Sequence, residues 1–138
     1  MQRVITATRV EGNGGLVSKA EKERCILAVD DHPKVLRFLE IGLKLHGFKV
    51  IATTSGEEAL ELVKSARPDV MLLDMLMPGM DGFEVLRRLR VSTQLPVIAC
   101  SASLETQFDA MRLGASCFMA KPFQLNEIVG KIEELLKS

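Results

Sequence analysis

From Cys25 onward, short apolar runs alternate with longer segments in which apolar residues recur every three or four positions. The short runs are Cys25–Val29, Lys49–Ala52, Asp69–Leu73, Leu95–Cys100 and Ser116–Met119. Near-continuous apolar runs predict strands buried on both faces, and the periodic segments predict amphipathic helices. Strands that alternate with helices form a parallel sheet with helices on both faces. We therefore expect an α/β fold, a doubly wound five-stranded parallel sheet with five helices.

Local signals place the helices between these strands. From Pro33 to Leu45, apolar residues at every fourth position predict one helical face. The segments Ser55–Glu58 and Asp81–Glu84 have the pattern of capping boxes and predict the starts of the next two helices. Further helices are expected over Leu104–Leu113 and over the last segment to about Leu136.

Length and charge limit the class of protein. The chain has 138 residues, enough for one domain with its own core. Its 18 basic and 18 acidic residues cancel, which argues against direct nucleic-acid binding, because that depends on excess positive charge. No apolar run reaches the length of a membrane span or a secretory signal, and the three cysteines lack metal-type spacing. We expect a cytoplasmic domain without nucleic-acid or membrane contact.

The first 24 residues differ from the rest of the chain. They contain a Gly- and Asn-rich breaker cluster at residues 11–15 and a polar, mostly charged stretch at residues 18–24. Five basic and three acidic residues give this segment a charge of +2, which leaves the remainder at −2. The prediction is a flexible N-terminal tail or linker over residues 1–24 and one folded domain over residues 25–138.

Polar residues cluster at the ends of the predicted strands. Asp30 and Asp31 follow the first strand, Asp74 the third, Ser101 the fourth, and Lys121 comes soon after the fifth. Singly, Asp30 or Asp31 reads best as a turn former and Lys121 as a surface lysine. Ligands of parallel α/β sheets bind at the carboxyl ends of the strands, so together these residues predict one site.

Three close carboxylates repel one another unless a cation lies between them, and Mg²⁺ prefers oxygen ligands of this kind. Lys121 and Ser101 could then hold phosphoryl oxygens, which makes the set suitable for phosphoryl transfer. Asp74 is the best candidate nucleophile, because carboxylates form aspartyl-phosphate intermediates. His32 and His46 have no partner at ligand spacing and are interpreted as ordinary surface or satisfied histidines.

Four motifs in order resemble the receiver domain of two-component response regulators. They are Ile26–Pro33 with the acidic pair, Val70–Gly82 with Asp74, Pro96–Ala102, and Phe118–Phe123. The resemblance covers nearly all of residues 25–138. It implies a flavodoxin-like fold with strand order 2-1-3-4-5.

The resemblance also implies a metal and a phosphorylation site. Asp74 would accept a phosphoryl group from the phosphohistidine of a sensor histidine kinase or phosphotransfer protein. Asp31 would bind Mg²⁺ directly and Asp30 mainly through water, with Asp74 and the Leu76 backbone carbonyl as further ligands. Lys121 would hold a phosphoryl oxygen.

A conformational switch is implied as well. Ser101 would move toward the phosphoryl group and Phe118 would swing inward, changing the face of the fourth helix, fifth strand and fifth helix. A downstream protein target or output domain would read that change. Phe118 lacks the phenol of many members, so its part in the switch is packing alone.

Leu76 has no polar side chain to position an attacking water, so we expect slow self-dephosphorylation. The protein is not expected to be a classical enzyme, since the only reactions expected are its own Mg²⁺-dependent phosphorylation and this slow loss of phosphate.

The alternative from a different class is a phosphorylation-independent docking module with the same fold, against which the complete set of five polar residues argues. An aspartyl-phosphatase would need a second Asp two residues after Asp74, where Leu76 stands, and a flavin protein would need a phosphate loop after the first strand. The receiver domain would account for all of residues 25–138, so the protein is expected either to signal by docking alone or to be part of a longer regulator or hybrid kinase.

Overall fold

The computed structural model describes residues 23–137, so nearly all of the tail expected over residues 1–24 lies outside the described residues. Five strands form one parallel sheet in the order β2-β1-β3-β4-β5. They are β1 (Cys25–Val29), β2 (Lys49–Thr53), β3 (Val70–Asp74), β4 (Val97–Ser101) and β5 (Cys117–Ala120). The predicted fold class and strand order are therefore confirmed.

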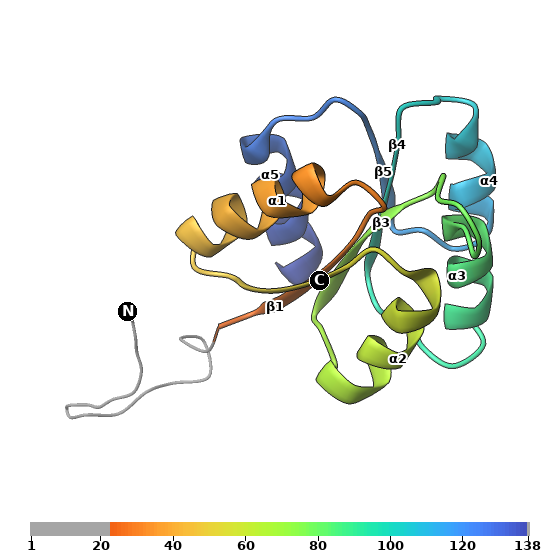
Figure 1. The fold of residues 1–138 in the computed structure, drawn as a ribbon, viewed down its shortest axis with the longest axis horizontal. Coiled ribbons are helices and arrows are strands. Elements are labelled where there is room, and N and C mark those ends of the chain that lie inside the picture. Colours follow the sequence, from red (N-terminus) through yellow and green to blue (C-terminus); the bar gives the residue numbers. More distant parts are fainter. Residues whose placement is uncertain (1–22, 138) are drawn as a thin grey trace.

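Residues 23–137 contain five helices, of which four connect successive strands and the last follows β5. They are α1 (Pro33–Leu45), α2 (Gly56–Ala66), α3 (Gly82–Leu89), α4 (Thr106–Arg112) and α5 (Leu125–Lys137). In Figure 1, α1 and α5 lie on one side of the sheet, and α2, α3 and α4 lie on the other. None of these helices is both long enough and apolar enough to cross a bilayer.

The sheet separates two hydrophobic cores. Ile26 and Ala28 of β1 contribute to the core under α1 and α5, whereas Leu27 and Val29 contribute to the core under α2, α3 and α4. Successive side chains of a strand point to opposite faces, so a strand covered on both faces must be apolar throughout. This arrangement explains the continuous apolar runs of the sequence.

The two predicted helix starts are capped, but only in part as expected. Ser55 Oγ accepts a hydrogen bond from the Glu58 N–H at 3.1 Å, and Asp81 Oδ1 accepts one from the Glu84 N–H at 3.0 Å. The second half of each capping box is absent from the described structure. The Glu58 carboxylate instead accepts from the buried Thr53 hydroxyl, and Glu84 pairs with two arginines of α3. Side-chain donors, a hydroxyl for Glu58 and two guanidinium groups for Glu84, bind the carboxylates in place of the N-cap N–H groups.

Two element starts differ from the prediction by two residues, and several other boundaries differ by one. β4 begins at Val97 and not at Leu95, because Pro96 has no N–H for the strand ladder. α4 begins at Thr106 and not at Leu104, because the Thr106 N–H and hydroxyl both donate to the Ser103 carbonyl and form a turn there.

Gly82 fixes the path of the loop between β3 and α3. Its N–H donates to the Met75 carbonyl at 3.1 Å, which folds the loop back onto the end of β3. A Cβ at this position would lie 2.5 Å from the Asp74 carbonyl oxygen and 2.6 Å from the Met75 Cα. Backbone atoms cannot move aside as a flexible side chain can, so only glycine fits here.

Candidate functional site

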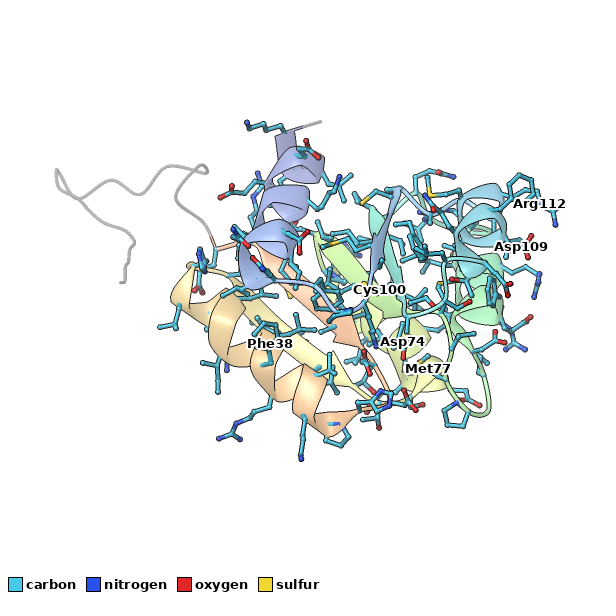
Figure 2. The ribbon with its side chains drawn as sticks, turned by 90° about the horizontal axis from the view of Figure 1, so that it is seen from above. Phe38, Asp74, Met77, Cys100, Asp109 and Arg112 are labelled. Atoms are coloured by element: carbon cyan, nitrogen blue, oxygen red, sulfur yellow. The ribbon has the colours of Figure 1, made fainter. Side chains whose placement is uncertain are left out.

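The register of the sheet brings the predicted site residues to one edge. Val29 of β1 pairs with Leu73 of β3, Leu73 with Ala99 of β4, and Ala99 with Phe118 of β5. The residues that follow these positions therefore project from the same edge. Figure 2 shows one of them, Asp74, near the middle of the molecule.

Two buried carboxylates and one ammonium form the centre of the site. Asp30 and Asp74 are each 4% exposed, which is unusual for charged side chains. Lys121 Nζ donates to Asp30 Oδ2 at 2.7 Å and lies 3.6 Å from Asp74 Oδ2. The structure thus brings Asp30, Asp74 and Lys121 together, as the strand ends predicted.

The carboxylate oxygens differ in how well they are satisfied. Asp30 Oδ1 accepts from the His32 N–H at 2.9 Å, and its Oδ2 accepts from Lys121. Asp31 Oδ1 and Asp74 Oδ2 are buried and have no hydrogen-bond partner within residues 23–137. A buried acceptor without a hydrogen-bond partner destabilises the folded state, so each of these two oxygens indicates a partner that the described chain does not supply.

A divalent cation could supply the partner that these carboxylate oxygens lack. One ligand atom from each of Asp30, Asp31, His32 and Asp74 lies within 4.8 Å of every other. Carboxylate oxygens at such spacing are the ligands that Mg²⁺ takes in proteins. The Leu76 N–H donates to Asp74 Oδ1 at 3.3 Å, so the backbone after β3 also faces the site.

Electrostatics show that negative charge is in excess. Burial, followed by the charge of Asp30, raises the pKa of Asp74 to about 6, and the opposing effects of Lys121 and the Leu76 N–H do not cancel this. Burial lowers the pKa of Lys121, but its hydrogen bond to Asp30 and the charges of Asp30 and Asp74 outweigh burial and raise that pKa overall. The raised pKa of Asp74 means that its negative charge is disfavoured, and the raised pKa of Lys121 means that its positive charge is favoured. Both shifts indicate that a cation would be stabilised at this site.

The remaining predicted residues lie around this centre. Ser101 is 1% exposed, and its hydroxyl accepts from the Ser103 N–H at 3.0 Å, so the hydroxyl hydrogen is not used in that bond. Phe118 is half-buried against the core under α2, α3 and α4. The Leu76 side chain is 50% exposed.

His32 was not predicted to belong to the site. Its ring is exposed as expected, but Nδ1 lies 3.0 Å from Asp30 Oδ1 and 3.2 Å from Asp31 Oδ1. The interpretation of His32 as a histidine without such partners was therefore wrong. A histidine directly after an acidic pair at a strand end, followed by Pro33, is the signal that could have revealed it.

This fold and site define the class of protein. The family model of the response regulator receiver domain matches residues 26–133, and the chain belongs to this family. Members of the family typically bind a divalent metal ion and interact with histidine kinases and output targets, and the acidic cluster described above is compatible with a phosphoacceptor site.

Individual relatives agree with this assignment. The chain is 34% identical over 119 residues to a protein of Porphyridium aerugineum named "Probable transcriptional regulator ycf27", covering 85% of this chain but 49% of the relative, and so spans about half its length. The receiver domain of the Francisella response regulator 1452 is 30% identical, with a TM-score of 0.78 over 83% of this chain and 98% of that one. The Vibrio cholerae chemotaxis protein CheY4 is 28% identical, with a TM-score of 0.77 over 83% and 99%.

Proposed function

We propose that this receiver domain is a phosphoacceptor and that Asp74 is the residue phosphorylated. The observation that carries the proposal is the state of Asp74 Oδ2. It is buried, it has no hydrogen-bond partner in the described chain, and it lies 3.6 Å from the Lys121 ammonium. A nucleophilic oxygen beside a fixed positive charge is what transfer of a negatively charged phosphoryl group requires.

The donor is the phosphohistidine of a sensor histidine kinase or phosphotransfer protein. An Asp74 carboxylate oxygen forms a bond to phosphorus while the nitrogen–phosphorus bond breaks and its electron pair returns to the histidine ring, which takes up a proton. Lys121 and the hydroxyl hydrogen of Ser101 hold phosphoryl oxygens during this step.

Mg²⁺ is the proposed cofactor, with Asp31, Asp74 and the Leu76 carbonyl as its protein ligands. Bound there, it would neutralise carboxylate charge and hold a phosphoryl oxygen in place. Asp30 already accepts hydrogen bonds on both oxygens, which supports a role for it through water. Asp31 Oδ1 and Asp74 Oδ2 have no hydrogen-bond partner among residues 23–137, which supports direct ligation by both.

Phosphate loss from Asp74 is proposed to be slow. The exposed Leu76 side chain stands beside the site and carries no atom that could orient a water molecule for attack. A half-life of seconds in the presence of Mg²⁺ would contradict this part of the proposal.

The signal is proposed to leave through the face of α4, β5 and α5, with Ser101 and Phe118 as the switch. Leu104, in the turn before α4, and Phe108, in α4, are 66% and 73% exposed. A groove of about 550 Å³ runs between β5 and α5, and Phe118 lines it. An exposed apolar patch beside a groove supports contact with a downstream protein or output domain.

The test is phosphorylation of the intact chain with acetyl phosphate and Mg²⁺, followed by mass spectrometry. We expect the mass of one phosphoryl group on the natural protein and on Asp69→Asn, and none on Asp74→Asn. Asp69 is a matched control, since it lies at the opposite end of β3. Equal labelling of all three proteins would reject Asp74 as the acceptor, and no labelling of any would favour the docking-module alternative.

A further inference from the structure

The imidazole of His32 faces the metal site from its solvent side. Its Nδ1 lies 3.0 Å from Asp30 Oδ1 and 3.2 Å from Asp31 Oδ1, although the side chain is 64% exposed. This nitrogen belongs with the oxygens of Asp30, Asp31 and Asp74 to one group of atoms within 4.8 Å of one another. The site therefore offers one nitrogen atom, in addition to the carboxylate oxygens, as a possible metal ligand.

The backbone holds this imidazole in place. A residue before proline is confined to extended conformations, and His32 has φ −100° and ψ 108° before Pro33. Its N–H donates to Asp30 Oδ1, and its carbonyl accepts from the Val35 and Leu36 N–H groups at the start of α1. Nδ1 is 3.0 Å from the same Asp30 oxygen and donates a hydrogen bond to it in the tautomer that carries the ring proton on Nδ1. Ligation uses the other tautomer, in which the proton is on Nε2 and the lone pair of Nδ1 is free. The ring thus starts from an ordered segment, which lowers the entropic cost of ligation.

The separations match those of neighbouring ligands around an ion. Donors about 2.1 Å from an octahedrally coordinated ion lie about 3.0 Å apart when adjacent and about 4.2 Å apart when opposite. The distance of 3.2 Å from Nδ1 to Asp31 Oδ1 is close to the adjacent separation. Asp74 Oδ2, buried and without a hydrogen-bond partner in the described chain, supplies a third donor.

We propose that His32 Nδ1 is a ligand of the bound ion, so that this site favours first-row transition ions over Mg²⁺. Imidazole nitrogen is a good ligand for first-row transition ions, whereas Mg²⁺ prefers oxygen ligands. Among the transition ions, Ni²⁺ and Co²⁺ bind nitrogen-containing sites more tightly than Mn²⁺ does. This inference rests on the metal site of the proposed function and adds an element-specific preference to it.

The experiment compares the natural chain, without an affinity tag, with His32→Gln and His46→Gln. His46 is the only other histidine of the sequence, and its ring contacts the Gly42 carbonyl at the end of α1, so it is a matched control. Titration calorimetry would measure Ni²⁺ and Mg²⁺ affinity. We expect His32→Gln to weaken Ni²⁺ binding about tenfold or more while Mg²⁺ binding changes by less than about twofold. His46→Gln should change neither.

A spectroscopic measurement gives a second readout. With Mn²⁺ bound, pulsed electron paramagnetic resonance should detect a directly bonded imidazole nitrogen in the natural chain and in His46→Gln, but not in His32→Gln. Mn²⁺ binding without this nitrogen signal would overturn the inference and leave the proposed metal site standing. An equal loss of Ni²⁺ and Mg²⁺ affinity in His32→Gln would also overturn the inference, because it would show that His32 positions the carboxylates and does not bind the ion. Failure of the natural chain to bind any divalent ion would overturn the proposed site as well.

Discussion

The two ends of the parallel sheet differ in how fully their polar groups are hydrogen-bonded. At the amino end, Asp69 Oδ2 accepts from the Cys25 N–H at 2.7 Å, and the Val97 N–H donates to Ser116 Oγ at 3.0 Å. The Arg90 guanidinium makes two hydrogen bonds to the Gly114 carbonyl, at 2.9 and 3.0 Å. These polar groups connect neighbouring loops and are satisfied.

At the carboxyl end, the carboxylates of Asp31 and Asp74 each keep a buried oxygen without a hydrogen-bond partner in the described chain. Aspartate is thus a stabilising residue at one end of β3 and a destabilising one at the other. Proteins depart from full satisfaction of polar groups mainly at functional sites, and here the departure coincides with the proposed site. The comparison can be tested by changing each end separately.

The largest effect is expected from Gly82→Ala, which forces a methyl group against the backbone at the carboxyl end. With contacts of 2.5 and 2.6 Å to backbone atoms, we expect a loss of about 3 kcal/mol in the free energy of unfolding. Urea denaturation followed by circular dichroism would measure it. The control is Gly130→Ala in α5, where a Cβ would meet no described atom within 4 Å and should stabilise the helix slightly. Similar stabilities for both variants would show that the β3–α3 loop has room to move.

Asp74→Asn should stabilise the metal-free protein at pH 7.5, because it removes a buried charge that burial and Asp30 disfavour. The pKa of Asp74 is raised from 3.8 to about 6, which corresponds to on the order of 2 to 3 kcal/mol at neutral pH. Denaturation in the presence of a chelator would measure the gain. A variant less stable than the natural protein would mean that the Lys121 interaction with Asp74 outweighs the cost of burial.

The same shift predicts a pH dependence. Between about pH 4 and pH 6 the folded protein keeps a proton on Asp74 that the unfolded chain has lost. Raising the pH through this window therefore removes stability from the natural protein, and the advantage of Asp74→Asn should disappear near pH 4. A stability difference independent of pH would exclude Asp74 titration as its cause.

Mg²⁺ should remove part of the penalty at the carboxyl end. At a concentration tenfold above its dissociation constant, an ion that binds only the folded state stabilises it by about 1.4 kcal/mol. Thermal unfolding with and without Mg²⁺ would test this in the natural protein and in Asp74→Asn, which should respond less. Equal responses would place the ion elsewhere.

The smallest effect is expected from Asp69→Asn at the amino end, with the opposite sign. The amide keeps an oxygen for the Cys25 N–H but loses the charge that strengthens this bond and attracts Arg24, 3.9 Å away. We expect a loss of about 1 kcal/mol in unfolding free energy. If both Asp→Asn variants shifted stability in the same direction, the contrast between the two ends would be wrong.

The fold was predictable because burial on both faces leaves a local pattern. Every residue of β3 is buried, so Val70–Leu73 had to be apolar, and Asp74 stood out against it. The meeting of Asp30, Asp74 and Lys121 followed from the rule that the carboxyl ends of parallel strands share one edge.

Other features depend on side-chain orientations that tertiary contacts decide. Nothing local in the sequence indicates that Lys121 donates to Asp30 and only approaches Asp74, or which carboxylate oxygens remain unpaired. The position of the His32 ring depends on backbone angles restricted by Pro33 and on a hydrogen bond to Asp30. The partners of Glu58 and Glu84 were missed for the same reason.

The bond from Lys121 to Asp30 also has a consequence for folding. It joins groups 91 positions apart in the chain, and Lys121 follows β5, the edge strand at the end of the sheet order. Long-range pairings of this kind pay the entropy of loop closure before they contribute stability. A nascent chain that has reached β3 already holds its carboxylates but lacks their ammonium partner Lys121, so this charge pairing is established only after the last strand has docked.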